Sequence, residues 1–368
     1  MKKNKNNHGV SEILYYNDTV NIIYEACTAC YNNTKDISYE EKKEYIKRRV
    51  NAGHDSVLEH GYVSFIIHDI PNTPEFAEAM SQIIGPAHYL YIQSAEMEDG
   101  TFSLLIGGSV RAYKHFIIEM GNYNNLKNNF IAYHILKILS ITTVKEFYGS
   151  TYGIIMCSEL GIYFVDEVDD YYDTVDGENP CTYNNSLISI LDGFIPIKNY
   201  RDIFCKVYRY GFVEDDVKNV LPVTVLFKNM SRTATHQLVR HRNAITQESQ
   251  RYVDYSNAKF TIPDMSSYME DYEDKKFNIE IKGIKYDITL EELSEMAISI
   301  YPQLLKQGMK KEDARAFLPS NVQCGRLYMT FTYKSLEKFI ALRTDPHAQT
   351  EIRKYAESIR DLYHDIYY

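Results

Sequence analysis

A short stretch in the second half of the chain, "RHRNAITQESQRY" at 240–252, concentrates hydrogen-bonding side chains with few apolar residues between them. The polar side chains in it that could bind a ligand are Arg240, His241, Arg242, Gln247, Ser249 and Arg251. Arginine suits phosphates because its planar donors match two oxygens at once, whereas Gln and Ser suit the edges of a pyrimidine or flavin ring. Two other interpretations stay open: a polar surface loop with ion pairs, and a single-stranded nucleic-acid site with Tyr252 and Tyr255 as stacking platforms.

The segment just before this stretch, "SRTATHQLVR", has the pattern of a helix with Ser231 as its N-cap. Gln237 and Arg240 are three residues apart, so a helix places them on one face. We therefore expect an amide and a guanidinium to reach one point.

A second arginine interrupts an apolar pattern near the C-terminus. In "TYKSLEKFIALR", Leu336, Phe339 and Ile340 have helical spacing, and Arg343 continues the same stripe. A guanidinium on a buried face is costly unless it meets an anion or several acceptors. The pattern predicts a ligand or a carboxylate partner for Arg343.

The stretch "GHDSVLEH" at 53–60 is a third polar cluster, with His54, Glu59 and His60. Its histidines are six residues apart, which does not match the helical spacing of a zinc site, and we expect no metal. Binding of a polar ligand and capping of local structure both remain open. We find no serine or cysteine with the pattern of an activated nucleophile.

The elements that must position these residues are predicted from local patterns. Ser38 and Glu41 open a helix over 38–53 with a capping box, and β-branched and aromatic runs predict strands over 61–70 and 220–229. The segment "IGGSVRA" at 106–112 could be a glycine turn that leads into a helix N-terminus and forms an anion site, but a plain turn between a strand and a helix is the favoured explanation. Residues 1–18 are polar and predicted to lack regular structure. We find no internal repeat.

Composition limits the function classes. The net charge of −10 argues against a protein that grips a nucleic-acid backbone, although a small anionic ligand needs only a local basic cluster. No segment has the length and apolar character of a signal peptide or membrane span. We expect a cytoplasmic protein.

Taken together, "GHDSVLEH", "SRTATHQLVRHR", "QESQRY", "ARAFLPSN" and "LRTDPHAQTEIRKYA" resemble, in this order, the segments that mark the flavin-dependent thymidylate synthases. That family converts deoxyuridylate to thymidylate. Its carbon donor is 5,10-methylenetetrahydrofolate, and the hydride comes from FAD reduced by NADPH. The resemblance covers about 20–68 and 218–363, so it implies one catalytic domain over 19–368 with an inserted region at about 69–218.

The resemblance implies an α/β fold with a central sheet flanked by helices, assembled as a homotetramer with active sites at subunit interfaces. It also implies roles for individual residues, without a protein nucleophile. The implied FAD contacts are His54, Ser56, Glu59, Arg240, His241 and Arg242. The implied deoxyuridylate contacts are Gln237, Arg240, Gln247, Ser249, Arg251, Arg315 and Arg343. Of these, Arg343, Ser249 and Gln237 would take part most directly in catalysis, with Arg343 polarising the pyrimidine.

Three features depart from the family pattern. The spacer "NAITQE" between Arg242 and Ser249 has six residues, where members usually have seven or eight. Thr332, Lys334 and Lys338 stand where members commonly have an asparagine, an arginine, and an asparagine or histidine near the flavin. The chain is also longer than a typical member. The alternative hypothesis is therefore a catalytically impaired member that binds deoxyuridylate or FAD as a regulatory protein.

Overall fold

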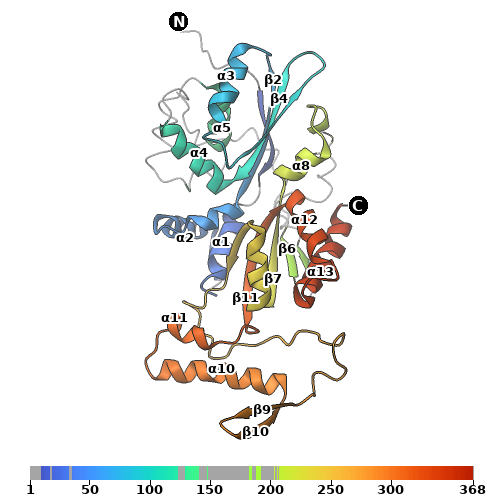
Figure 1. The fold of residues 1–368 in the computed structure, drawn as a ribbon. Helices are drawn as coiled ribbons and strands as arrows, with labels where there is room; N and C mark the ends of the chain where they lie inside the picture. Colours follow the sequence, from blue (N-terminus) through green and yellow to red (C-terminus); the bar gives the residue numbers. More distant parts are fainter. Residues whose placement is uncertain are drawn as a thin grey trace.

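The computed structural model describes residues 10–16, 19–32, 35–122, 129–140, 147, 182–184, 188–191, 203, 205 and 207–367. The predicted α/β fold is confirmed, and the described strands divide into two larger sheets and one hairpin. These parts follow one another along an elongated molecule (Figure 1). Much of the region predicted as an insertion, 69–218, lies outside the described residues.

The first sheet has the strand order β1-β2-β4-β3. All of its neighbours are antiparallel. The elements of this part are β1 (Val10–Tyr16), α1 (Thr19–Ala29), α2 (Tyr39–Asn51), η1 (Asp55–His60), β2 (Tyr62–Ile70), α3 (Pro74–Ile83), β3 (Tyr91–Glu96), β4 (Phe102–Ser109), α4 (Val110–Asn122) and α5 (Phe130–Ser140). Strand β1 lies within the stretch that was predicted to lack regular structure, where pairing with β2 orders the backbone.

The second sheet has the order β5-β6-β7-β11-β8. The elements of this part are β5 (Thr182–Asn184), β6 (Ile188–Leu191), α8 (Glu214–Val220), β7 (Pro222–Ser231), α9 (Arg232–Leu238), η4 (Val239–His241), β8 (Ala244–Gln247), β11 (Gln323–Thr332), α12 (Tyr333–Arg343) and α13 (Thr350–Tyr367). A third part extends below this sheet in Figure 1, with the hairpin β9 (Phe277–Ile281) and β10 (Ile284–Ile288), α10 (Leu290–Lys306), α11 (Lys311–Ala314) and η5 (Arg315–Phe317).

Local signals explain several of these boundaries. The Ser38 hydroxyl accepts from the Glu41 amide at 3.3 Å, and the Glu41 carboxylate accepts from the Ser38 amide at 2.9 Å, so the predicted capping box is confirmed. Ser231 caps α9 as predicted, accepting from the Ala234 amide at 3.1 Å. The predicted strands at 61–70 and 220–229 are confirmed as β2 and β7.

The predicted transition from strand to helix at 106–112 is confirmed, but the glycine turn is wrong, because Gly107 and Gly108 lie inside β4 and the helix begins directly at Val110. Gly107 is needed for close packing: a Cβ there would lie 2.7 Å from the Cβ of Val220. Ile66 and Leu105 of the first sheet belong to the same cluster of buried hydrophobic side chains as Val225 and Phe227 of β7. The two sheets therefore pack against each other and share a buried core.

Candidate functional site

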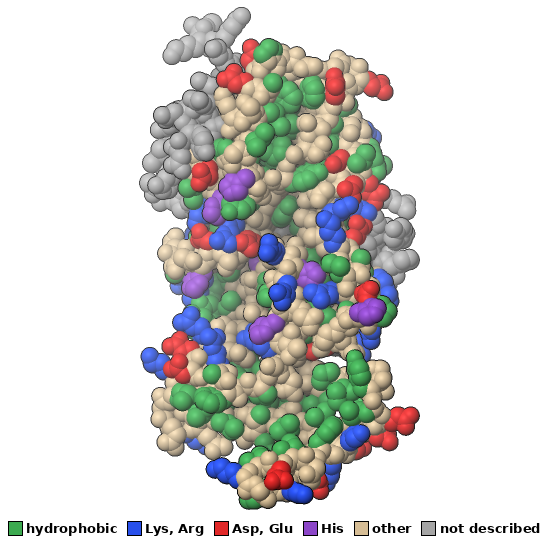
Figure 2. All heavy atoms as spheres, viewed as in Figure 1, with side chains coloured by type: hydrophobic (Ala, Val, Ile, Leu, Met, Phe, Trp, Pro, Cys, Tyr) green, Lys and Arg blue, Asp and Glu red, His purple; other side chains and the backbone are tan. Residues whose placement is uncertain are grey.

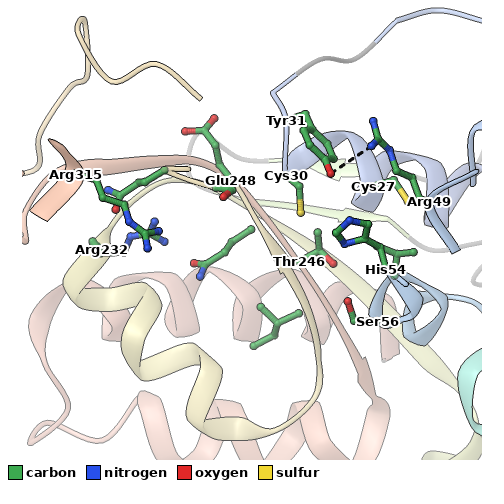
Figure 3. A pocket seen from close by; sticks show the side chains of 15 residues that line it. Cys27, Cys30, Tyr31, Arg49, His54, Ser56, Arg232, Thr246, Glu248 and Arg315 are labelled. Carbon is green, nitrogen blue, oxygen red and sulfur yellow. Dashed lines mark hydrogen bonds between the residues drawn. The ribbon is translucent and has the colours of Figure 1, made fainter. Parts of the chain in front are cut away.

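A first cavity of about 300 Å³ is lined by residues of α1, α2, η1, α9, β8 and η5 and of the segments next to them (Figure 3). It brings together five of the predicted ligand-binding residues, His54, Ser56, Gln247, Ser249 and Arg315. The sequence segments that supply them are distant from one another, and the fold assembles them into one site.

Two further arginines, Arg49 and Arg232, line the same cavity and were missed from the sequence. In the view of Figure 3, Arg232 lies close to Arg315 at one end of the cavity. Within the described ranges, neither Arg232 nor Arg315 has a carboxylate at ion-pair distance, so both guanidinium groups can accept an anionic ligand. Arg232 follows the Ser231 cap directly, but nothing in its sequence context distinguished it from a surface arginine.

A buried acceptor points to the kind of ligand this cavity takes. The side-chain oxygen Oε1 of Gln247 is buried and has no hydrogen-bond partner in the part of the chain that the structure describes. Buried polar groups are almost always paired, so this oxygen calls for an N–H or O–H donor. The cavity therefore offers Gln247 as an acceptor for the polar edge of a ring, and Arg232 and Arg315 as donors to an anion.

Tyr31 lines the first cavity and contacts an aromatic ring and a guanidinium group beside it. Tyr31 stacks on Tyr252 with ring centroids 4.9 Å apart, and the Arg49 guanidinium lies 4.3 Å from the centre of the Tyr31 ring. The Ser249 amide donates to the Cys30 carbonyl at 3.1 Å, which ties the end of β8 to the end of α1. These contacts hold Ser249 in place at the wall of the cavity.

The thiols in and near this cavity are not activated. Burial raises the pKa of Cys27 to about 12 and that of Cys324 to about 11, and burial also raises the pKa of Cys30. A thiolate, not a thiol, is the effective nucleophile. None of these three cysteines is therefore poised to attack a substrate.

A second cavity of about 370 Å³ contains two other predicted residues, Glu59 and Arg242. It is also lined by Ser109, Arg111 and His115, from the β4–α4 junction. Arg111 forms an ion pair with Glu59. Ser109 and Arg111 belong to the segment 106–112, for which an anion site remained an open alternative, whereas His115 was not assigned to a site.

A third group contains the predicted Gln237, His241 and Arg343. Arg343 donates from Nε to His241 Nε2 at 2.9 Å and from Nη1 to Gln237 Oε1 at 3.3 Å. Of the two predicted partners of Arg343, a ligand or a carboxylate, no carboxylate lies at ion-pair distance among the described residues, where two neutral acceptors contact it. Burial and the charge of Arg343 lower the pKa of His241, which keeps its ring neutral and able to accept. Burial and the nearby charge of Arg240 lower the pKa of Arg343.

Arg251 is not brought into either of these cavities. Its guanidinium is half exposed and pairs with Glu312 at 3.3 Å. Figure 2 shows Lys, Arg and His side chains gathered across the middle of the face in view, between more apolar regions above and below. The acidic chain thus carries a local basic zone, as a small anionic ligand requires.

The two cavities are connected through a buried histidine. His60 contacts Thr246 at 3.0 Å through Nε2 and Thr330 at 2.9 Å through Nδ1. Thr246 lines the first cavity and Thr330 lines the second. Burial lowers the pKa of His60 to about 3, so it is neutral, with one ring nitrogen as donor and the other as acceptor.

Among the described residues, no group of three or more His, Cys, Asp or Glu side chains is placed to hold a metal ion. Nor does any helix within the described ranges have the length and apolar character needed to cross a membrane.

Comparison with known proteins shows where the similarity lies. Residues 209–367 match a family model described as "Thymidylate synthase complementing protein". A protein of Pyrococcus abyssi named flavin-dependent thymidylate synthase is 34% identical over 167 residues, covering 39% of this chain and 61% of the relative. Relatives of the same name from Pyrococcus furiosus (33% over 149 residues, 40% and 56% covered) and Mycobacterium tuberculosis (32% over 146 residues, 38% and 57% covered) match similarly. The matched part spans a little more than half the length of these relatives.

Proposed function

From the match of residues 209–367 to the thymidylate synthase complementing protein family and the similarity to flavin-dependent thymidylate synthases, we propose that the chain belongs to the flavin-dependent thymidylate synthases and converts deoxyuridylate to thymidylate. The proposed carbon donor is 5,10-methylenetetrahydrofolate, and the proposed source of reducing equivalents is NADPH through FAD. The observation that carries the proposal is one cavity holding both a buried unpaired amide oxygen and two arginines without carboxylate partners among the described residues.

Deoxyuridylate fits this donor and acceptor set. Its phosphate is an anion that Arg232 and Arg315 can bind, and the imide N–H of its pyrimidine is the kind of donor that Gln247 Oε1 lacks. Ser249, held by its backbone contact to Cys30, would orient the nucleotide. Holding the ring in one position contributes to the rate because orientation entropy is lost on binding rather than in the reaction.

Other predicted substrate contacts lie apart from this cavity in a single chain. Gln237, Arg240 and Arg343 form their own cluster, and Arg251 is exposed. We propose that these residues complete the site of another copy in a homo-oligomer, for which the resemblance implies a tetramer. Arg343 would then polarise the pyrimidine, stabilising charge that develops on the ring.

FAD fits the remaining predicted residues. His54 and Ser56 line the first cavity, Glu59 and Arg242 line the second, and His241 belongs to the Arg343 cluster. The Arg111 ion pair neutralises Glu59, so the described lining of the second cavity has no uncompensated acidic side chain that would repel a dinucleotide. When bound, FAD supplies the hydride transfer that the reaction needs.

The chain's own residues would then bind and orient the substrate and exclude water from it. None of them would form a covalent bond with the substrate. This division agrees with the raised pKa values of Cys27, Cys30 and Cys324, which keep these three thiols protonated. Charge developing on the substrate would be stabilised by fixed donors, which act most strongly in a site shielded from water.

The proposal is tested by measuring thymidylate formation by the purified protein with deoxyuridylate, methylenetetrahydrofolate, FAD and NADPH. We expect product, and none in a parallel reaction without FAD. If the folded protein binds deoxyuridylate but forms no product, the alternative of a non-catalytic binding protein is correct. Replacing NADPH by NADH in the same assay reports the preferred nicotinamide.

A further inference from the structure

The two larger sheets have the same topology. Four strands of the first sheet, in chain order β1, β2, β3 and β4, are arranged as first-second-fourth-third. Strands β6, β7, β8 and β11 of the second sheet follow the same order. All six neighbouring pairs are antiparallel. The structure therefore contains a repeat that the sequence analysis did not detect.

The helices extend the correspondence. We call the two four-stranded arrangements within the chain its first copy (β1 to β4) and its second copy (β6, β7, β8 and β11). In each copy, a helix follows the second strand. Another helix begins directly after the fourth strand, namely α4 after β4 and α12 after β11. The last strand residue caps this helix in both copies: Ser109 accepts from the Ala112 amide at 3.2 Å, and Thr332 from the Ser335 amide at 3.2 Å.

The buried positions of these two helices also coincide. Counting from the first helical residue, Val110, Tyr113 and Phe116 of α4 match Tyr333, Leu336 and Phe339 of α12, and all of them are buried. By the same count, Arg111 and His115 of the first copy correspond to Lys334 and Lys338 of the second.

The second cavity lies where the two copies meet, and equivalent elements of both line it. Each copy contributes its junction between fourth strand and helix, with Ser109 and Arg111 from one and Thr332 from the other. Each also contributes residues at or just before its third strand, Tyr89 from the first copy and Arg242 from the second. The cavity is thus a shared site between copies.

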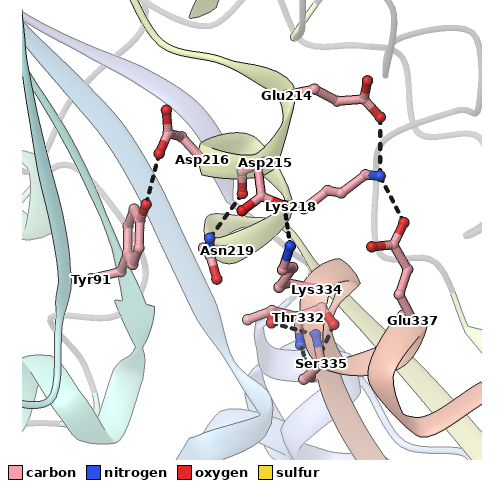
Figure 4. A network of polar contacts seen from close by, with 10 residues as sticks. All are labelled: Tyr91, Glu214, Asp215, Asp216, Lys218, Asn219, Thr332, Lys334, Ser335 and Glu337. Atoms are coloured by element: carbon pink, nitrogen blue, oxygen red, sulfur yellow. Dashed lines mark hydrogen bonds and ion pairs between the residues drawn. The ribbon is translucent and has the colours of Figure 1, made fainter. Parts of the chain in front are cut away.

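The basic groups at the two junctions are used differently. Lys334 pairs with Asp215 on α8, outside this cavity, as Figure 4 shows. Arg111 and His115 instead line the cavity together with Arg242. Arg111 binds Glu59 through Nη1, while its Nε is buried and has no partner among the described residues. Among the described residues that line it, the cavity has two guanidinium groups and one carboxylate, which is already paired, and such a lining favours an anionic ligand.

We propose that Arg111 and His115 of the first copy, with Arg242 of the second, bind the diphosphate of FAD in this cavity. This inference rests on the proposed function, and it gives a role to a segment outside the matched residues 209–367. Residues 89–115 then form a wall of the cofactor site. Glu59 holds the Arg111 guanidinium in place while its remaining donors meet the phosphates.

The test compares FAD with riboflavin, which has the same ring system but no phosphate. Binding is measured by quenching of flavin fluorescence in the parent protein and in Arg111→Gln. We expect the variant to bind FAD about tenfold or more weakly, because a charge-assisted hydrogen bond is lost. Riboflavin affinity should change less than about twofold, since this ligand makes no phosphate contact.

Three further variants separate binding from folding. Arg360→Gln is the matched control, because it removes an exposed arginine that pairs with Asp361 and lines neither cavity, and it should leave FAD affinity unchanged. The double variant Glu59→Gln/Arg111→Gln leaves neither partner of the ion pair as an unpaired charge. It should still lose affinity for FAD and keep its affinity for riboflavin. Arg111→Lys should restore part of it. Circular dichroism checks that each variant is folded.

Equal losses for FAD and riboflavin, or no loss for either, would overturn the inference. So would a parent protein that binds FAD no more tightly than riboflavin. Thymidylate formation by the same preparations tests the proposed function separately. A parent that binds FAD with the expected selectivity but forms no thymidylate would contradict only the proposed function, whereas an active parent with an unaffected Arg111→Gln would contradict only this inference.

Discussion

Arg343 shows at the level of one residue how the structure changed a prediction. The apolar stripe predicted a ligand or carboxylate for it, and in the single chain its partners are His241 and Gln237, both neutral. A guanidinium bound only to neutral acceptors keeps its full positive charge available for a ligand.

We expect Arg343→Ala to lower thymidylate formation about a hundredfold or more, the usual effect of removing a group that stabilises developing charge. The turnover rate of the purified variant checks this. Arg360→Ala is the matched control, because Arg360 is an exposed arginine that pairs with its neighbour Asp361. Unchanged turnover in Arg343→Ala would remove this residue from the site.

His60 leads to a prediction about pH. Its pKa lies near 3 in the folded protein, against 6.5 for an ordinary histidine, because burial disfavours the charged ring. The unfolded chain therefore binds a proton first as pH falls. The contribution of His60 to stability is complete above pH 6.5 and is lost as the pH falls toward 3, by about 1.4 kcal/mol per pH unit.

Urea unfolding between pH 7 and pH 4.5 measures this contribution. His60→Gln can still donate to one threonine and accept from the other, but it does not titrate, so its stability should depend less steeply on pH. His236→Gln changes an exposed histidine and should keep the slope of the parent. Parallel slopes for His60→Gln and the parent would contradict the prediction.

At the scale of an element, the short spacer between Arg242 and Ser249 is explained by strand β8. Residues Ala244–Gln247 pair with β11, with Thr246 opposite Tyr328 and Gln247 opposite Leu327. The same register places Thr246 against His60. The six-residue spacer is therefore part of a paired strand, whose register specifies which side chains face the cavity.

Inserting one alanine after Ala244 should abolish deoxyuridylate binding and lower the melting temperature. The extra residue reverses the faces of the residues that follow, so Gln247 and Thr246 leave their present positions. Calorimetric titration and thermal unfolding measure both effects. An insertion variant that forms more thymidylate than the parent would show instead that the short spacer is a defect.

At the scale of the whole molecule, the separation of the predicted contacts bears on assembly. One chain leaves the Arg343 cluster outside the cavity that contains Gln247 and Arg315. We therefore expect a homo-oligomer in solution. Since each chain already contains two copies of the four-stranded arrangement, two chains would supply as many copies as four single-copy subunits.

Sedimentation equilibrium measures the number of chains, and we expect two or four. Activity should fall on dilution below the dissociation constant, because the shared sites come apart. The matched comparison is FAD affinity at the same dilutions, since the second cavity is formed within one chain. A fully active monomer would contradict the prediction.

The sequence alone was sufficient to predict local features of the structure, such as helix caps and strands. The capping box at Ser38, the cap at Ser231 and the strands β2 and β7 depend on residues a few positions apart. Such short-range patterns also carry the family resemblance over the matched part. They are readable because the interacting groups are neighbours in the chain.

Only the tertiary structure decided which distant groups meet. It separated Arg251 from the first cavity, added Arg49 and Arg232 to it, and joined Arg111 to Glu59 and His60 to Thr330. It also showed the repeated sheet topology, whose two copies share a strand order but little evident sequence pattern. These contacts depend on strand pairing and on the packing of two sheets, which act between residues far apart in the chain and leave no local signal.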